Sequence, residues 1–243
     1  MSEELPALLA LAVRKIFRPV FGGGGATALD GLDLRLEPGC VLGMLGANAS
    51  GKSTTLRILA GLVAPDAGRA EVFGFPAGSV EARARLGYLP DRDVFYGYLT
   101  PRENLVLAAS LRGLGRGESR RRADRLLERF GLSESAGIRC AALSKGLRRR
   151  LGLAISLAGE PDLLLWDEPW DGLDPAAAAI LTGVIAELRA RGAAILMAGH
   201  LIPDLLDNSD RLLLLERGRV AASGPAAGFT LEGLFARFRA GNG

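Results

Sequence analysis

The chain has 243 residues, of which 49% are hydrophobic and 23% charged, and its formal net charge is +3. This composition is typical of a folded globular protein and excludes a largely disordered chain, because disorder requires low hydrophobicity with high net charge. No apolar run approaches the roughly 20 residues that a membrane-spanning helix needs. Ser2, Glu3 and Glu4 stand where a secretory signal would carry positive charge, so we expect a cytoplasmic protein.

Short apolar runs alternate with helical stretches, which is the βαβ pattern of a mostly parallel sheet. The first unit has a predicted strand at Val41–Leu45 and a predicted helix at residues 52–60. The segment between them fits G-x-x-x-x-G-K-[ST], the pattern of a phosphate-binding loop. The nine residues that we expect to contact ATP here are Gly46, Ala47, Asn48, Ala49, Ser50, Gly51, Lys52, Ser53 and Thr54.

This loop lies where phosphate binding requires it. Backbone N–H groups of a tight loop, together with the positive end of the following helix, surround phosphate oxygens. Lys52 is expected to reach the β- and γ-phosphates, and the Ser53 hydroxyl to bind Mg²⁺. A chance match is conceivable in a glycine-rich chain, but the strand–loop–helix setting favours the functional interpretation.

The middle of the chain is predicted to be helical. After a short strand at Leu86–Leu89, helices are expected at Pro101–Leu111 and at residues 118–130 and 144–157. The alternation of strands and helices then resumes, with a strand at residues 163–166 and a helix at 175–191. Further strands are expected at 194–198, 212–215 and 219–222, and a last helix at 229–239. We therefore predict one domain in which a helical subdomain, residues 92–158, is inserted into an α/β core formed by residues 1–91 and 159–243.

The densest basic segment lies in this helical region. Arg116–Arg129 interleaves its arginines with acidic residues and has no aromatic side chain that could stack on bases, apart from Phe130 at its end. A solvated helix face with i,i+4 pairs such as Glu118–Arg122 explains the pattern better. No nucleic-acid partner is expected.

Two adjacent carboxylates follow the predicted strand at residues 163–166. Ligands of open α/β sheets bind at the carboxyl ends of the strands, so Asp167 and Glu168 are placed for catalysis. Asp167 is expected to hold Mg²⁺ and Glu168 to polarise the attacking water. Taken alone, Asp-Glu-Pro after a strand is usually only a turn, but after a phosphate loop it is seldom that.

The segment from Leu143 to Arg150 reads Leu-Ser-Lys-Gly-Leu-Arg-Arg-Arg. Periodicity by itself says only that Ser144 caps a basic helix. With the phosphate loop and the Asp-Glu pair, the chain resembles the ABC ATPase family, whose signature is usually LSGGQ. That resemblance implies that Ser144 and the Gly146 backbone face the γ-phosphate held by a second copy of the chain. Lys145 and Leu147 replace a glycine and a glutamine of that signature.

The resemblance covers roughly residues 8–224, with its motifs in the family's order. It implies that Asp174 belongs to the loop that joins the two protomers and that His200 contacts the γ-phosphate. His200 is the chain's only histidine. Phe17 is our choice for the aromatic ring that stacks on adenine, with Phe21 as the alternative.

Two residues depart from the family's pattern. Asp91 stands where a glutamine usually ends the strand before the helical insertion, and we include it among the expected Mg²⁺ ligands. Ala49 stands where the phosphate loop usually has glycine, which would cost about 1–2 kcal/mol if that position requires a positive φ.

Together these features predict a RecA-like P-loop NTPase core with a small N-terminal antiparallel β region and an inserted helical subdomain. The resemblance implies ATP hydrolysis with Mg²⁺ in an ATP-sandwich homodimer. It further implies an integral membrane transporter subunit as partner, most similar to that of a two-component exporter, on the cytoplasmic face of the cell membrane. The alternatives are a soluble ABC ATPase that does not transport and a weakly hydrolysing regulatory nucleotide-binding protein.

Overall fold

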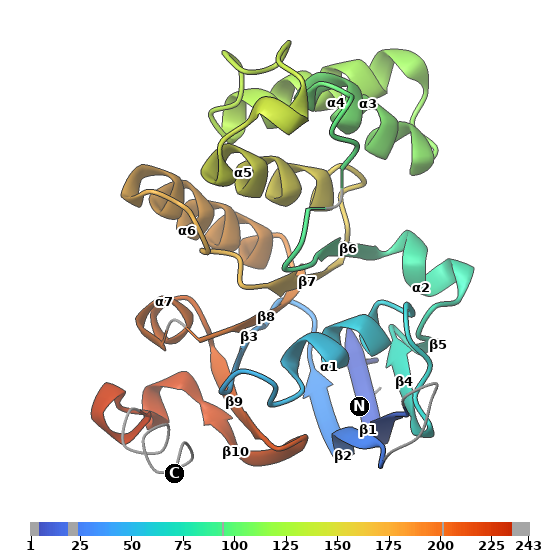
Figure 1. Ribbon diagram of the computed structural model, residues 1–243, viewed down its shortest axis with the longest axis vertical. Helices are drawn as coiled ribbons and strands as arrows, with labels where there is room; N and C mark the ends of the chain where they lie inside the picture. Colours follow the sequence, from blue (N-terminus) through green and yellow to red (C-terminus); the bar gives the residue numbers. More distant parts are fainter. Residues whose placement is uncertain (1–4, 19–23, 94, 201, 235–243) are drawn as a thin grey trace.

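The computed structural model describes residues 5–18, 24–93, 95–200 and 202–234. Its strands form two sheets (Figure 1). A six-stranded sheet has the order β10-β9-β3-β8-β7-β6, and a four-stranded sheet has the order β2-β1-β4-β5. The predicted α/β class with a small antiparallel region is confirmed.

The six-stranded sheet is parallel except for its edge strand β10, which pairs antiparallel with β9. Its inner strands are buried on both faces, which is why they read as continuous apolar runs in the sequence. Its strands are β3 (Val41–Leu45), β6 (Leu86–Leu89), β7 (Leu163–Asp167), β8 (Ala194–Gly199), β9 (Arg211–Glu216) and β10 (Arg219–Pro225).

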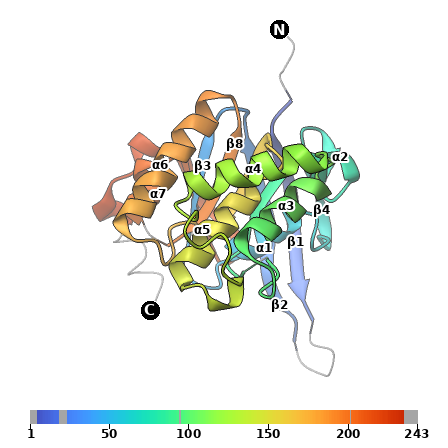
Figure 2. The same ribbon diagram turned by 90° about the horizontal axis from the view of Figure 1, so that it is seen from above.

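This sheet separates two apolar cores. On β7, Leu164 and Trp166 point to one core, while Leu163 and Leu165 point to the other, because successive side chains of a strand face opposite sides. The first core also contains the apolar faces of α5 (Lys145–Ser156) and α6 (Pro175–Ala190). The second core contains α1 (Lys52–Leu59), which contacts strands of both sheets. Figure 2 shows α6 to the left of β3 and β8, next to α7.

The antiparallel sheet contains the first two strands of the chain. Strand β1 pairs with β2 from Leu8 opposite Leu36 to Phe17 opposite Ala26, so the far end of this hairpin carries Phe17. Its strands are β1 (Leu8–Phe17), β2 (Ala26–Leu36), β4 (Ala67–Val72) and β5 (Phe75–Pro76). A short helix, α2 (Val80–Ala84), then leads back to β6.

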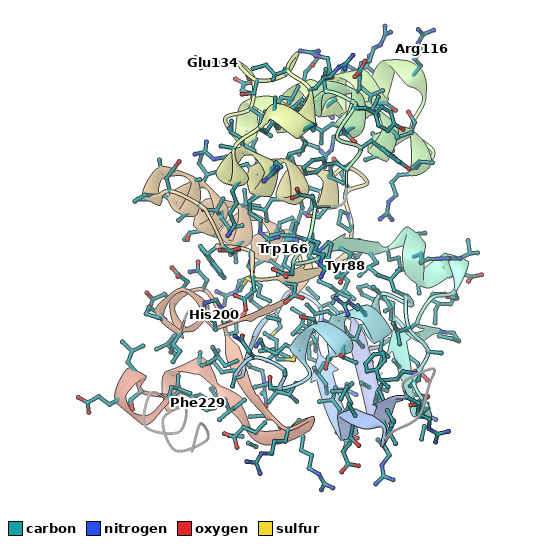
Figure 3. The ribbon with its side chains drawn as sticks, viewed as in Figure 1. Tyr88, Arg116, Glu134, Trp166, His200 and Phe229 are labelled. Carbon is teal, nitrogen blue, oxygen red and sulfur yellow. The ribbon has the colours of Figure 1, made fainter. Side chains whose placement is uncertain are left out.

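Helices α3 (Pro101–Leu111), α4 (Arg116–Arg129) and α5 lie between β6 and β7 in the chain and form the upper part of Figure 1. A capping box between Thr100 and Glu103 starts α3. Trp166 of β7, at the centre of Figure 3, donates its indole N–H to Ser156 Oγ of α5 at 3.0 Å. This bond ties the helices to the main sheet.

The predicted pair Glu118–Arg122 is wrong. Glu118 pairs instead with Arg121 and Arg125, at 2.7 and 2.9 Å. Arg122 points inward, with only 14% of its side chain exposed, and binds Glu160 and the Leu157 carbonyl. The i,i+4 spacing identified a geometrically possible partner, but tertiary packing directs the Arg122 side chain to Glu160 and Leu157 instead.

Three short elements remain. They are the helix α7 (Ile202–Asp207) and the 3₁₀ turns η1 (Cys140–Ala142) and η2 (Ala226–Gly228). Residues 231–234 are helical, and the rest of the helix predicted at 229–239 lies outside the described residues. Within the described ranges, no helix combines the length and apolar character that crossing a bilayer requires.

Candidate functional site

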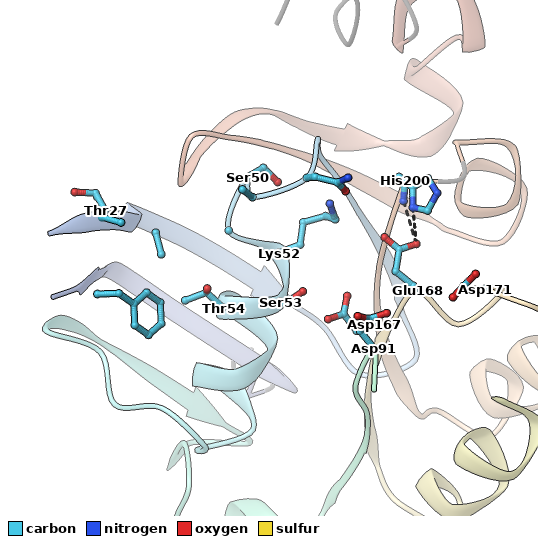
Figure 4. Close-up of a pocket in the computed structure, with 16 residues that line it drawn as sticks. Thr27, Ser50, Lys52, Ser53, Thr54, Asp91, Asp167, Glu168, Asp171 and His200 are labelled. Atoms are coloured by element: carbon cyan, nitrogen blue, oxygen red, sulfur yellow. Dashed lines mark hydrogen bonds and ion pairs between the residues drawn. The ribbon is translucent and has the colours of Figure 1, made fainter. Parts of the chain in front are cut away.

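The carboxyl ends of β3, β6, β7 and β8 meet the start of α1 at a cleft of about 510 Å³ (Figure 4). This is the edge at which open α/β sheets bind ligands. Most of the residues that the sequence predicted for the site line this cleft, and they come from segments far apart in the chain. They are Phe17, Asn48, Ala49, Ser50, Gly51, Lys52, Ser53, Thr54, Asp91, Asp167, Glu168 and His200.

The phosphate loop needs glycine for steric reasons at two positions. A Cβ at Gly46 would lie 2.4 Å from Ser50 Oγ and 2.6 Å from the Leu215 carbonyl oxygen. Gly51, which caps α1, has φ of 111° and no room for a side chain beside the Ala28 carbonyl. Such a backbone is open to glycine alone, so the loop can turn sharply into α1.

Lys52 is the cation of the loop, and its side chain is buried with 7% exposure. Its Nζ donates to the carbonyl oxygens of Gly46 at 2.7 Å and Ala47 at 3.1 Å, two predicted residues that do not themselves line the cleft. Burial lowers the pKa of Lys52, while the negative charges of Glu168 and Asp167 oppose that shift. Neutral carbonyls solvate an ammonium only partly, so a phosphate oxygen would be a better partner.

A second feature of the loop fits an anionic ligand. The hydroxyl oxygen of Ser50 is buried and has no hydrogen-bond partner among the described residues. A buried hydroxyl without a partner is costly, and a phosphate oxygen in the cleft would provide one. Lys52, Ser50 and the N-terminus of α1 therefore fit a polyphosphate.

Ala49 has φ of 62°, so the position does adopt the left-handed conformation at which alanine is strained. An L-residue there costs about 1–2 kcal/mol, whereas glycine adds about 0.4–1 kcal/mol of unfolded-state entropy. We expect Ala49→Gly to bind ATP at least as tightly as the parent and to melt at the same or a higher temperature. Isothermal titration and thermal unfolding check this. A clear loss of affinity would show that the side chain of Ala49 contributes to the site.

Asp167 fits the role of metal ligand. It ends β7 with 2% exposure, and the Ser53 side chain lies beside it. Burial raises the pKa of Asp167, the neighbouring Ser53 side chain opposes this, and the charges of Glu168 and Asp91 raise it further. A divalent cation would reverse this unfavourable electrostatic environment.

The donor set is one that Mg²⁺ accepts. In the described part of the chain, no group of three or more His, Cys, Asp or Glu side chains could hold a metal ion by itself. Mg²⁺ is usually held by one or two protein oxygens, with phosphates and waters completing the octahedron. Ser53 and Asp167 supply such oxygens, and Asp91 lines the same cleft.

Glu168 and His200 contact each other at the opposite wall of the cleft (Figure 4). His200 Nδ1 lies 2.9 Å from Glu168 Oε2, and the His200 backbone N–H donates to the same oxygen at 3.3 Å. Glu168 is largely buried and His200 is exposed. Glu168 also has φ of 51°, a strained backbone that turns its side chain into the cleft.

Besides Gly46 and Ala47, three predicted nucleotide contacts outside the phosphate loop do not line this cleft: Ser144, Gly146 and Asp174. Ser144 caps α5 by accepting from Leu147 N at 3.3 Å. Asp174 caps α6 by accepting from Ala177 N at 2.8 Å and also pairs with Arg150. The structure therefore does not bring these residues to the cleft within one chain.

Sequence reasoning missed several lining residues. Ala26, Thr27 and Ala28 of β2 reach the cleft beside Phe17 because the β1–β2 hairpin extends over it. Asp171 lines the other end. Only hairpin pairing could have indicated the β2 residues. Phe17 lies at the rim with 43% exposure, and Phe21, the alternative adenine contact, lies outside the described residues.

The chain is also similar in sequence to known proteins. The family described as "ABC transporter" matches residues 29–171. The chain is 40% identical over 205 residues to the daunorubicin resistance ATP-binding protein DrrA3 of Streptomyces coeruleorubidus, covering 84% of this chain and 65% of that protein. It is 39% identical to the Nod factor export ATP-binding protein I of Paraburkholderia xenovorans, covering 83% and 67%. The chain thus spans about two thirds of these relatives.

Solved structures agree. The structure described as an ATP-binding subunit of an ABC transporter is 28% identical, with a TM-score of 0.84 over 96% of this chain and 99% of that one. A dimeric ATP-binding cassette bound to ADP and Pi has the same fold, with a TM-score of 0.84 over 91% of this chain and 100% of that one, at 24% identity.

Proposed function

The chain belongs to the ABC transporter family, and from that premise we propose that it binds and hydrolyses ATP to drive export through a separate membrane subunit. One observation carries the proposal. A single cleft gathers Lys52 for phosphate charge, Asp167 for a metal ion and Glu168 for water activation. The names of the relatives, which are ATP-binding proteins of drug resistance and Nod factor export, support the export direction.

The binding step follows from charge. The ammonium of Lys52 leaves two neutral carbonyls for the β- and γ-phosphates, while N–H groups at the start of α1 bind further phosphate oxygens. Ser53 and Asp167 would hold Mg²⁺, and a bound Mg²⁺ would neutralise charge that develops on the phosphates. Phe17, at the rim, stacks on the adenine.

The hydrolytic step belongs to Glu168. Both contacts from His200 reach Oε2 of this carboxylate, so we assign the other oxygen, Oε1, to the attacking water. His200 orients Glu168 and, being exposed, is accessible to the γ-phosphate. Asp91 lies beside Asp167 in the same cleft and is proposed to contact the metal ion or its waters.

A second copy of the chain completes the site in this proposal. Ser144 and the Gly146 backbone stand at the N-terminus of α5, where they do not reach the chain's own cleft. We propose that they contact the γ-phosphate held by a partner copy, with Asp174 in the loop between the two. Hydrolysis then separates the copies.

The membrane subunit is proposed to dock near the C-terminal end of α1, away from the cleft at its start. A hollow of about 500 Å³ is lined there by the end of α1, by α2 and by the end of α3. Leu62, Val80 and Leu111 are each more than 60% exposed at this hollow, which is unusual for large apolar residues. It lies between the α/β core and the helices of residues 92–158, which we propose to move as a subdomain. The protein would then work on the cytoplasmic face of the membrane.

The two-copy arrangement has a direct test. Glu168→Gln should retain ATP but not hydrolyse it, and should therefore form a stable homodimer with ATP that size-exclusion chromatography separates from the monomer. ADP should not support the dimer. Adding Ser144→Arg should block dimerisation while each monomer still binds ATP, because a bulky side chain would occupy the position of the γ-phosphate.

Two outcomes would contradict this arrangement. If Glu168→Gln stays monomeric with ATP bound, the second ATPase chain is a different protein and the homodimer is wrong. If Ser144→Arg dimerises normally in that background, the N-terminus of α5 does not face the nucleotide.

A further inference from the structure

Arg149, in the second turn of α5, carries a buried guanidinium with an unusual set of partners. Its side chain crosses to the main sheet, and the residue is only 8% exposed. Nη1 donates to the carbonyl oxygen of Pro90 at 2.9 Å, and Nη2 donates to the carbonyl oxygens of both Asp167 and Glu168. One side chain thus joins α5 to the ends of β6 and β7.

This placement is energetically expensive. Burial lowers the pKa of Arg149 because its charge is desolvated. Its Nε atom is buried without a hydrogen-bond partner, and no ion pair joins Arg149 to a carboxylate among the described residues. All three hydrogen bonds of this buried cation go to neutral carbonyls, which is costly, and the charges of Asp171, Asp91, Asp167 and Glu168 offset the desolvation only in part. The cost indicates a role other than filling space.

The partners of Arg149 show what that role is. Nη2 binds the carbonyls of two consecutive residues, which lie on either side of the Glu168 Cα atom. The peptide N–H of Glu168 donates in the opposite direction, to Ala198 O at 2.7 Å. These bonds restrain both backbone dihedrals of Glu168 and stabilise its left-handed φ of 51°. The direction of its side chain, toward His200 and the cleft, follows from that backbone.

We propose that Arg149 is the positioning residue for Glu168 and links its carboxylate to the position of α5. This inference rests on the proposed role of Glu168 as the group that activates water. The N-terminus of α5 carries Ser144 and Gly146, and the Pro90 carbonyl that Arg149 also binds directly precedes Asp91. A shift of α5 against the main sheet would therefore alter Glu168 and the Asp91 segment together. Arg149 touches no reacting group itself, and of the residues it holds, Glu168 is the one through which we expect it to act on the rate.

The test compares Arg149→Met and Arg149→Lys with the parent in the full-length chain. Arg149→Met removes all three hydrogen bonds, and we expect kcat to fall by about tenfold or more, since small misplacements of a catalytic group have large effects on rate. KM for MgATP and the dissociation constant for MgADP should stay within about threefold of the parent, because Lys52 and its loop are untouched. Arg149→Lys keeps a cation that reaches the paired carbonyls and should restore part of kcat.

Arg122→Met is the matched control. Arg122 is another inward-pointing arginine that donates to a backbone carbonyl, Leu157 O at 2.8 Å, and has a buried Nε without a partner. It lies away from the cleft, so its replacement should lower the melting temperature without changing kcat. If both Met variants lower kcat equally, the effect is a general loss of structure and the inference is wrong.

The decisive readout is a double-mutant cycle with Glu168→Gln. If Arg149 acts through Glu168, Arg149→Met should not lower the residual rate further in the Glu168→Gln background. A further loss of tenfold there would overturn the inference, as would a parental kcat for Arg149→Met alone. Should Arg149→Met fail to fold, Arg149→Lys decides in the same cycle. If instead Glu168→Gln hydrolyses ATP at the parental rate, the proposed function of Glu168 fails first, and the positioning role fails with it.

Discussion

Lys52→Ala is expected to abolish ATP turnover and productive ATP binding. The change removes the buried cation that we place on the β- and γ-phosphates, where each charge-assisted hydrogen bond contributes about 1.5–3 kcal/mol. Losing one such contact corresponds to a loss of affinity of roughly 10–100-fold, and turnover should fall further because the contact strengthens as charge develops. Equilibrium binding of ATP and release of phosphate measure the two effects separately.

Arg35→Ala is the control for this prediction. It removes a cation of β2 whose surface pair with Glu37, at 2.6 Å, lies on exposed side chains outside the cleft. A surface pair of this kind contributes about 0–1 kcal/mol to stability, so binding and turnover should match the parent. Turnover by Lys52→Ala at the parental rate would contradict the assignment of the phosphate loop.

Glu168→Gln is expected to slow hydrolysis by roughly 10²–10⁴-fold, the usual contribution of a general base. ATP affinity should be kept, because the phosphate contacts come from Lys52 and α1. Glutamine has the shape of glutamate, and its amide oxygen can still accept from His200, which contacts Glu168 Oε2 at 2.9 Å. The fold and the dimer should therefore survive while the proton acceptor is lost.

If Glu168→Gln hydrolyses ATP slowly and also binds it weakly, Glu168 contributes to ATP binding as well as to hydrolysis. Parental hydrolysis by Glu168→Gln would exclude this residue as the base. His200→Ala should lower kcat by removing the Nδ1 contact to Glu168 Oε2 while the backbone N–H contact remains, with little change in melting temperature because His200 is exposed.

Much of the core could be predicted from the sequence because its signals are local. The phosphate loop lies between an apolar run and a helix, and the structure places β3 and α1 at those positions. The acidic pair likewise follows the apolar run that forms β7. The positive φ considered for Ala49 was also a local feature, because the left-handed conformation belongs to the loop itself.

Contacts that depend on tertiary packing could not be predicted. Arg149 looked like one arginine in a basic helix, because its partners at Pro90 and Asp167 are distant in the sequence. The pair Glu118–Arg122 was predicted wrongly for the same reason, since the partners of Arg122, Glu160 and the Leu157 carbonyl, are also distant in the sequence. Ser144 was predicted as a nucleotide contact from family resemblance, and one chain leaves it away from the cleft. That prediction requires a second copy to test.

Phosphate release from MgATP, measured side by side for the parent, Lys52→Ala and Glu168→Gln, tests the central claim most directly. The account predicts steady release by the parent and none by Lys52→Ala. Glu168→Gln should bind ATP as the parent does but release phosphate roughly 10²–10⁴-fold more slowly. Equal release by all three preparations would contradict the claim that this cleft hydrolyses ATP. Tight ATP binding by the parent without any release would show a nucleotide-binding regulator instead of a motor.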